Sequence, residues 1–274
     1  MLQPSRSSLP ALQSTSLCDA VSSTFRDRFA PVTHKIEILF ASNNHRHRDT
    51  LVGDGRPLDT SKYFVVGVGL LGTVNGSTSN PASINPSTQL PWGKTFPSIS
   101  VRDSVNLQVK LLKEELKVSS VKCVVGGSFG GMQTLEYMVG YSPFVRSGIP
   151  IACGASHSPW QIGISETQRQ CIYLDPKWEE YDFDDPPFAG LEVARQIGMV
   201  SYRTAEGFQN KFGRKIKGKK NEYGSDTMWD VKSYLVYQGK KFAERMDPMS
   251  YVRNNTASCG AVWAYFRDQF CTAS

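Results

Sequence analysis

Histidine is scarce in this chain, and its placement limits the catalytic chemistry available. The 274 residues include 4 histidines, His34, His45, His47 and His157. Imidazole is the most frequent general base near neutral pH, so few residues offer a base-assisted mechanism. His45 and His47 lie two residues apart, but no cluster of thiolates or carboxylates accompanies them. We therefore predict a solvated loop there and no metal site.

Long apolar runs and paired cysteines are also lacking. The longest uncharged apolar stretch lies around residues 64–72, which is far too short to span a bilayer, so we expect no membrane segment. The 6 cysteines are scattered and form no C-x-x-C pair. This usage predicts a reducing compartment, and hence a cytoplasmic protein. A serine-rich stretch with several arginines at residues 1–30 keeps a mitochondrial location as the weaker alternative.

The chain also lacks an excess of acidic over basic residues. Lysine and arginine together number 31, aspartate and glutamate 25, and the net charge is +6. A mildly basic surface suits an anionic ligand. The densest basic run, residues 214–220, has no interleaved aromatic residues. We predict a solvated loop there and no nucleic-acid partner.

The most informative stretch that is present is Val124–Met132, which reads V-V-G-G-S-F-G-G-M. Residues 126–130 fit the pattern G-x-S-x-G, in which a serine occupies a strained turn between a buried strand and a helix. Such a turn leaves little room for neighbouring side chains. We predict that Ser128 is a nucleophile and that the Phe129 N–H is an oxyanion-hole donor at the helix N-terminus. The structural alternative is a glycine-rich turn whose serine caps the helix.

Apolar and amphipathic segments alternate around this turn. Strands are expected at residues 36–40, 63–69, 122–125 and 149–153, with Pro150 marking a sheet edge or bulge. The helix before the turn is expected to have Asp103 as its N-cap, and the helix after it to end near Gly140. Beyond residue 158 we expect helices at 164–174, 190–203 and 229–246 and no further strand. This order predicts a parallel α/β sheet followed by a helical region.

Many blocks of the chain resemble the homoserine O-acetyltransferase family, most closely its fungal members. Together they cover about residues 52–252 and lie on both sides of the Ser128 turn. They include residues 57–60, 63–66, 81–86, 101–103, 126–132, 134–137, 166–170, 175–178, 190–195, 201–203, 233–235 and 237–239. The resemblance implies an incomplete α/β-hydrolase parallel sheet with a mostly helical cap.

Patterning and resemblance together divide the chain into four parts. Residues 1–34 are expected to form a disordered tail, and residues 35–157 the α/β-hydrolase core with the nucleophile. Residues 158–250 are expected to form the helical cap, and residues 251–274 an atypical C-terminal tail.

The resemblance implies an acyltransferase of methionine biosynthesis. Ser128 would take the acetyl group from acetyl-CoA, as a co-substrate with no bound cofactor, and pass it to the hydroxyl of L-homoserine in a ping-pong mechanism. Arg195 matches a family arginine that grips the amino-acid substrate, and a guanidinium can hold a carboxylate in a bidentate fork. The alternative for Arg195 is an exposed helix salt bridge. The full-length form is expected to be a homodimer. L-Serine as acceptor, a plain esterase and a non-catalytic chain remain the alternatives.

Two departures from the family pattern bear on activity. The family carries its catalytic aspartate and histidine in a C-terminal segment, but here the similarity stops near Val252 and residues 253–274 contain no histidine. Residues 43–48 do not match the family's oxyanion loop. The resemblance therefore implies truncation at both ends, and we predict that this polypeptide is inactive or nearly so. His157 follows Ser128 and is the alternative base, although the family uses this position to lead into the cap.

Overall fold

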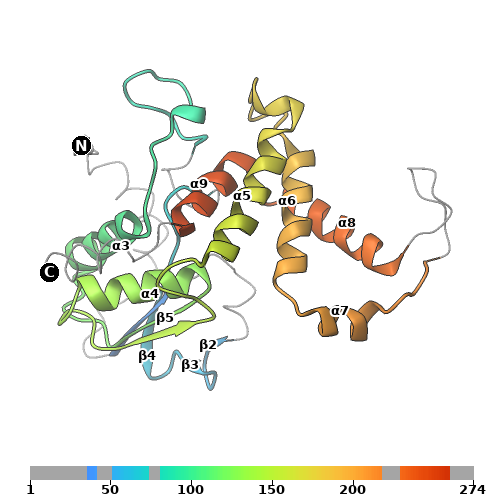
Figure 1. Cartoon of the computed structure of the whole chain (residues 1–274). Helices are drawn as coiled ribbons and strands as arrows, with labels where there is room; N and C mark the ends of the chain where they lie inside the picture. The colour runs from blue at the N-terminus through green and yellow to red at the C-terminus, as the bar shows by residue number, and fades with distance from the viewer. Residues whose placement is uncertain (1–35, 42–50, 74–80, 218–228, 260–274) are drawn as a thin grey trace, which may run out of the picture.

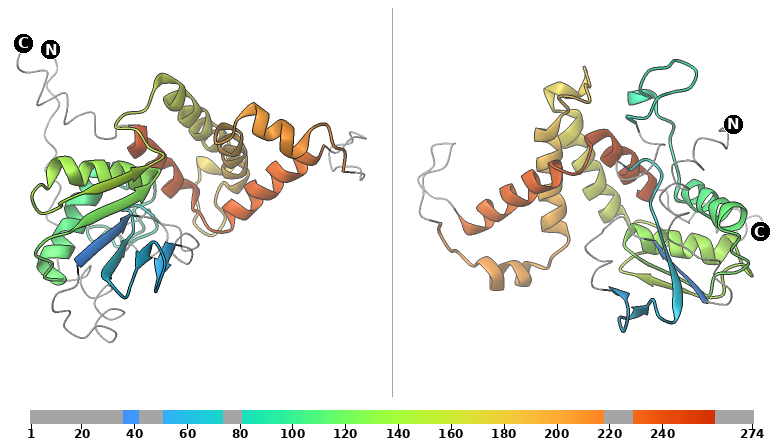
Figure 2. Two further views of the ribbon diagram at one scale, coloured as in Figure 1. Left: turned by 90° about the horizontal axis from the view of Figure 1, so that it is seen from below. Right: turned by 180° about the vertical axis from the view of Figure 1, so that it is seen from behind.

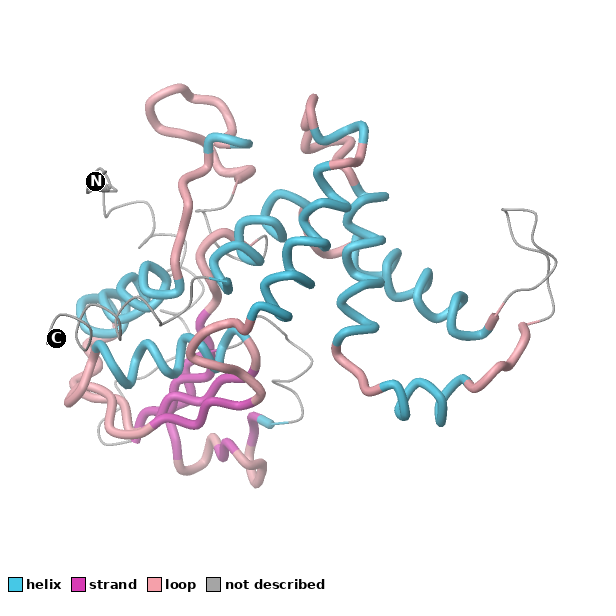
Figure 3. Tube along the Cα trace, viewed as in Figure 1, coloured by secondary structure: helices cyan, strands magenta, loops and turns pink. Residues whose placement is uncertain are grey.

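The computed structural model describes residues 36–41, 51–73, 81–217 and 229–259, which form two lobes (Figure 1). Strands are confined to the first lobe, and the second is helical (Figure 3). The strands are β1 (Ile36–Ala41), β2 (Val52–Gly53), β3 (Leu58–Asp59), β4 (Tyr63–Val68), β5 (Cys123–Gly127) and β6 (Gly148–Ile151). The α-helices are α3 (Val101–Lys110), α4 (Phe129–Gly140), α5 (Pro159–Tyr173), α6 (Phe188–Ser201), α7 (Ala205–Phe212), α8 (Asp230–Ala243) and α9 (Pro248–Cys259). Short turns of other helix types are η1 (Gly93–Thr95), η2 (Leu111–Glu115) and η3 (Pro176–Trp178).

Four parallel strands in the order β4-β1-β5-β6 form the main sheet. All four strands expected from the sequence are present, with ends shifted by one or two residues. Pro150 lies in β6, which is an edge strand of the described sheet. That position suits proline, because an edge strand does not need every backbone N–H for pairing. Because β5 and β6 pair in parallel, with Gly127 opposite Ile151, their carboxyl ends lie side by side, and the residue-128 turn follows the end of β5.

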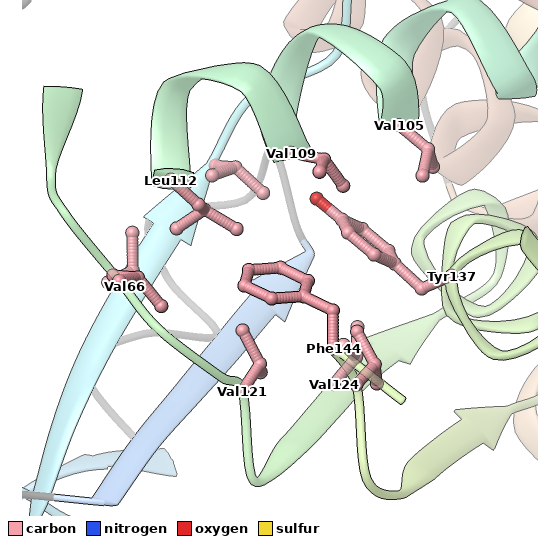
Figure 4. Packing of buried hydrophobic residues seen from close by; sticks show 11 residues of the cluster. Val66, Val105, Val109, Leu112, Val121, Val124, Tyr137 and Phe144 are labelled. Atoms are coloured by element: carbon pink, nitrogen blue, oxygen red, sulfur yellow. The ribbon is translucent and has the colours of Figure 1, made fainter. Parts of the chain in front are cut away.

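The main core lies between the sheet and helices α3 and α4 (Figure 4). Val66 and Val124 come from the sheet, and Val105 and Val109 come from α3. Tyr137 of α4 is fully buried among them. Full burial of an aliphatic side chain of this size contributes roughly 1.5–3 kcal/mol, so these contacts fix α3 and α4 on one face of the sheet.

Helix α3 starts earlier than the sequence pattern suggested. Ser100 is its N-cap, and the Ser100 hydroxyl accepts a hydrogen bond from the Asp103 N–H at 3.1 Å. In return, the Asp103 carboxylate accepts from the Ser100 N–H at 2.8 Å. The prediction of Asp103 as N-cap is therefore wrong. Asp103 is the third residue of a capping box, in which two helix-starting residues satisfy each other's backbone donors.

A buried hydrogen-bond network holds α4 against α3 and the end of β4. Gln108 Nε2 donates to the Gly69 carbonyl and to Gln133 Oε1, both at 2.8 Å. The Tyr137 hydroxyl donates to Gln108 Oε1 at 2.9 Å, and burial raises the pKa of Tyr137. An unpaired buried polar group costs about 1–3 kcal/mol. The network therefore fixes the helix that begins after residue 128.

The second lobe is helical, as expected from residue 158 onward. Ile172 of α5 and Leu191 of α6 are fully buried in its core. Helices α5, α6 and α8 correspond to the three helices that the sequence predicted, whereas α7 and α9 were not predicted. Helices α7 and α8 project away from the sheet in all views (Figure 2). No helix in the described ranges combines the length and the apolar character that a bilayer crossing requires.

Helix α9 crosses the boundary that we expected at residue 250. It continues to Cys259 and joins the two lobes, since it packs on α5 while contacting loops of the first lobe. Asn254 Nδ2 donates to the Gly72 carbonyl at 3.0 Å, and the Arg253 guanidinium donates to the Lys94 carbonyl at 2.6 Å. The expected N-terminal tail and residues 260–274 lie outside the described residues.

Candidate active site

Ser128 occupies the predicted turn between β5 and α4. Its backbone has φ 55° and ψ −119°, a conformation that costs a non-glycine residue roughly 1–3 kcal/mol. Its N–H donates to the Ile151 carbonyl at 2.9 Å, and its carbonyl accepts from the Gly131 and Met132 N–H groups at 2.9 and 3.1 Å. Strand β6 and the first turn of α4 therefore support the strain, as a nucleophile elbow requires.

Two glycines allow the end of β5, the start of α4 and Cys153 to pack closely around Ser128. A Cβ on Gly126 would overlap the Gly130 carbonyl oxygen, and a Cβ on Gly131 would lie 2.5 Å from Cys153 Sγ. Gly127 differs, because a Cβ there would meet no atom within 4 Å. The steric demand therefore falls on Gly126 within the G-x-S-x-G pattern and on Gly131 just after it, and not on Gly127.

The Ser128 side chain is exposed and makes no hydrogen bond that caps α4. The alternative reading, in which the hydroxyl caps the helix, is therefore wrong. Phe129 is the first residue of α4, so its N–H has no acceptor within the helix. The hydroxyl and this free amide lie at the positive end of the helix dipole. These are the positions predicted from the sequence for a nucleophile and one oxyanion donor.

His157 lies in the loop between β6 and α5 and is half-buried. Its Nδ1 is buried and has no hydrogen-bond partner among the described residues. Burial lowers the pKa of His157, which favours the neutral imidazole that a general base needs. No hydrogen bond joins His157 to Ser128 in the described part of the chain, so the structure does not pair the nucleophile with this base.

Two further predictions fall on residues that the structure does not describe. His45 and His47 lie within residues 42–50, as do residues 43–48, which do not match the family's oxyanion loop. Among the residues that are described, no group of three or more His, Cys, Asp or Glu could hold a metal ion.

Arg195 lies on α6 in the helical lobe. Its guanidinium carbon is 4.7 Å from the centre of the Phe242 ring and 5.7 Å from that of Tyr202. Its Nε is buried without an acceptor, and no described carboxylate forms a salt bridge with it. The exposed salt bridge considered as an alternative is therefore not formed. A guanidinium that lies near two aromatic rings and has an unpaired N–H can bind an anion.

A buried polar cluster beside Arg195 was not predicted. The Arg169 guanidinium donates to Asn255 Oδ1 at 2.6 Å. Gln168 Oε1 accepts from the Tyr251 hydroxyl at 3.0 Å and from Asn255 Nδ2 at 3.1 Å. Gln168 is 4% exposed and Arg169 is 8% exposed. The cluster joins α5 to α9, since Arg169 and Asn255 lie 86 residues apart in the sequence.

Curated proteins of similar sequence identify the family. A homoserine O-acetyltransferase from Nostoc punctiforme is 43% identical over 206 residues, which is 74% of this chain and 55% of that protein. One from Chloroherpeton thalassium is 43% identical over 205 residues, which is 74% of this chain and 52% of that protein. The chain belongs to the homoserine O-acetyltransferase family. No family model matches it.

The family assignment confirms the resemblance read from the sequence, and the chain spans about half the length of the curated family members it matches. Solved structures support the fold. A homoserine O-acetyltransferase from Bacillus anthracis superposes with a TM-score of 0.73 at 20% identity, covering 82% of this chain and 66% of that one. A variant of esterase E22 gives a TM-score of 0.71 at 25% identity, covering 83% of this chain and 69% of that one. The expected α/β-hydrolase fold with a helical cap is thereby confirmed.

Proposed function

We propose that Ser128 is the nucleophile of an acyl transfer from acetyl-CoA to the hydroxyl of L-homoserine. The observation that carries this proposal is the strained, exposed Ser128 at the end of β5, in a chain of this family. The Ser128 oxygen attacks the thioester carbonyl, the bond to sulfur breaks, and the free thiol of coenzyme A leaves. The homoserine hydroxyl then attacks the acetyl ester, so that O-acetylhomoserine forms and the serine hydroxyl is restored.

Phe129 and Arg195 have separate roles in this proposal. The Phe129 N–H faces the negative oxygen that develops at each tetrahedral intermediate, and the loss of one such donor typically costs ~3 kcal/mol of barrier. Arg195 binds the carboxylate of the amino-acid acceptor, which its unpaired Nε supports. The cap excludes water from the acyl-enzyme, because water would otherwise turn the transferase into a hydrolase.

Several finer points belong to the same proposal. The reaction uses acetyl-CoA as a co-substrate and needs no bound cofactor. The small-molecule substrates act in the cytoplasm, and the full-length protein forms a homodimer. L-Serine is the competing acceptor. A plain esterase is the competing activity, favoured by the likeness to the esterase E22 variant.

Product analysis tests the proposal. We would incubate the purified chain with acetyl-CoA and L-homoserine, L-serine or neither, and separate O-acetylhomoserine, O-acetylserine and free acetate. We expect O-acetylhomoserine to form slowly, because no described group activates the Ser128 hydroxyl, and the Ser128→Ala variant to form none. Free acetate as the main product would favour the esterase. Equal product from Ser128→Ala would contradict the proposal.

A further inference from the structure

Unused hydrogen-bond donors gather where α5, α6 and α9 meet. Arg195 Nε is buried and has no acceptor. Gln168 is 4% exposed, and its described hydrogen bonds all reach its Oε1 atom, which leaves Nε2 without a described acceptor. Buried donors are almost always paired in folded proteins. The unpaired Arg195 Nε therefore indicates a missing acceptor, and Gln168 Nε2 on the neighbouring helix offers it a second donor.

Gly198 on α6 allows these groups to converge. A Cβ at Gly198 would lie 2.9 Å from Gln168 Nε2 and 3.6 Å from the Tyr202 hydroxyl oxygen. Arg195 is on the same helix, and its guanidinium carbon lies 5.7 Å from the Tyr202 ring centre. An amide, a hydroxyl and a guanidinium therefore border one stretch of α6, where the absence of a side chain at Gly198 leaves room for the Gln168 amide.

The direction of the Gln168 amide follows from a chain of hydrogen bonds that begins at Arg169. A guanidinium can only donate, so the Asn255 atom that faces Arg169 at 2.6 Å must be the oxygen. Asn255 therefore turns its Nδ2 toward Gln168, and the Gln168 atom that accepts it at 3.1 Å must be Oε1. The Tyr251 hydroxyl donates to the same oxygen at 3.0 Å. The remaining polar atom of Gln168, beside Gly198, is the donating Nε2.

We propose that Gln168 is a further binding residue, which donates an N–H to the carboxylate of the amino-acid acceptor beside Arg195. This inference rests on the proposed function, because it assigns the acceptor's carboxylate a second contact. A carboxylate accepts from both donors at once, whereas an alcohol or a neutral ester leaves at least one of them unpaired. A site built to hydrogen-bond a polar group discriminates strongly against an analogue that lacks it. The cluster therefore selects free amino acids.

Binding measurements on the full 274-residue chain test this assignment. L-Homoserine, L-2-aminobutyrate (the same carboxylate without the hydroxyl) and L-homoserinol (an alcohol in place of the carboxylate) would be titrated by calorimetry. In Gln168→Glu, Tyr251 and Asn255 can still donate, but a carboxylate oxygen replaces the donating amide. We expect both carboxylate ligands to bind at least roughly tenfold more weakly, since a hydrogen bond to a charged group is lost and repulsion is gained. Homoserinol binding should not weaken.

A second variant acts without touching the ligand. In Asn255→Asp, both side-chain oxygens accept, so the Gln168 amide must turn its nitrogen toward residue 255 and its oxygen toward Gly198. We expect weaker binding of both carboxylate ligands again, with homoserinol unaffected. Gln209→Glu adds the same charge on the exposed face of α7 and should leave all three affinities unchanged. A thermal melt of each variant confirms that it folds.

The outcomes separate this inference from the function on which it rests. Wild-type affinity in folded Gln168→Glu overturns the assignment of Gln168 and leaves acyl transfer intact. Equal weakening of homoserinol also overturns it, because the effect would not depend on the carboxylate. Failure of the wild-type chain to bind either carboxylate ligand overturns it as well. Carboxylate binding that depends on Gln168 in a chain that transfers no acetyl group supports the assignment and contradicts the proposed function.

Discussion

The elbow at Ser128 and the cluster at Gln168 are two polar sites built in opposite ways. At the elbow, backbone hydrogen bonds and the close approach of Gly126 to Gly130 hold an exposed serine whose side chain has no hydrogen-bond partner among the described residues. At the cluster, side chains from α5 and α9 hold one another, and almost every polar atom has a partner. The elbow depends on the shape of the backbone, whereas the cluster depends on the direction of each hydrogen bond. Substitutions should therefore damage the two sites by different mechanisms.

The largest effect should come from adding one methyl group at the elbow. In Gly126→Ala the new Cβ overlaps the Gly130 carbonyl oxygen, and backbone cannot move aside cheaply. We expect the free energy of unfolding to fall by at least about 3 kcal/mol, measured by urea denaturation. Gly127→Ala is the matched control, since its Cβ meets no atom within 4 Å, and it should stay within about 1 kcal/mol of wild type. Equal losses in both variants would mean that the elbow is not sterically constrained at Gly126.

The second-largest loss of stability should follow from removing a hydrogen-bond donor in the Gln168 cluster. Arg169→Met removes the guanidinium that orients Asn255, leaves the part-buried Asn255 Oδ1 without this donor and removes the ion pair with Glu166. We expect a loss of about 2–3 kcal/mol in urea denaturation. Lys110→Met is the control, because Lys110 and Glu114 form an exposed pair, with side chains 54% and 59% exposed. That variant should lose no more than about 0.5 kcal/mol. A small loss at Arg169 would show that the cluster is not a coupled network.

A gain in stability should follow from relieving the strain at the elbow. Ser128→Gly places a residue that tolerates positive φ at φ 55°, and we expect it to raise the free energy of unfolding by about 1 kcal/mol. Ser128→Ala keeps the strained Cβ and should leave stability nearly unchanged. Thermal and urea denaturation of the three proteins would check this. A destabilised Ser128→Gly would contradict the strain.

The smallest effect concerns a carboxylate outside both sites. Hydrogen bonds from the hydroxyl and then the backbone N–H of Ser61 lower the pKa of Asp59 from 3.8 to about 2. A lowered folded pKa contributes stability that is fully present above the unfolded pKa and is lost as pH falls toward the folded value. We expect a small loss of stability between about pH 4 and pH 2 that Asp59→Asn lacks. Parallel melts at each pH would check this, and identical pH profiles would contradict it.

The same contrast explains how much the sequence could predict. The G-x-S-x-G pattern, the buried strand before it and the glycines after it lie within nine consecutive residues, so local rules suffice for the elbow. The N-cap of α3 was misplaced because Ser100 and Asp103 are both helix-starting residues, and a pattern does not say which of them caps. The domain boundary that we expected at residue 250 falls inside helix α9, which begins at Pro248.

The cluster could not be predicted, because its hydrogen bonds join residues of separate helices. The one local signal is that Gln168 and Arg169 lie four and three residues before the fully buried Ile172, on the inner face of α5. Polar residues at such positions indicate a buried network. Their partners in α9 become visible only in the folded chain.

Chemical rescue of Ser128 tests the central claim most directly. The chain would be incubated with acetyl-CoA at increasing concentrations of imidazole, an external base, and the attached acetyl groups would be located by mass spectrometry of proteolytic peptides. We predict slow acetylation of Ser128 that accelerates with imidazole and is absent in Ser128→Ala, because the elbow positions the hydroxyl but no described base activates it. Acetylation that avoids Ser128, or that persists equally in Ser128→Ala, would contradict the account.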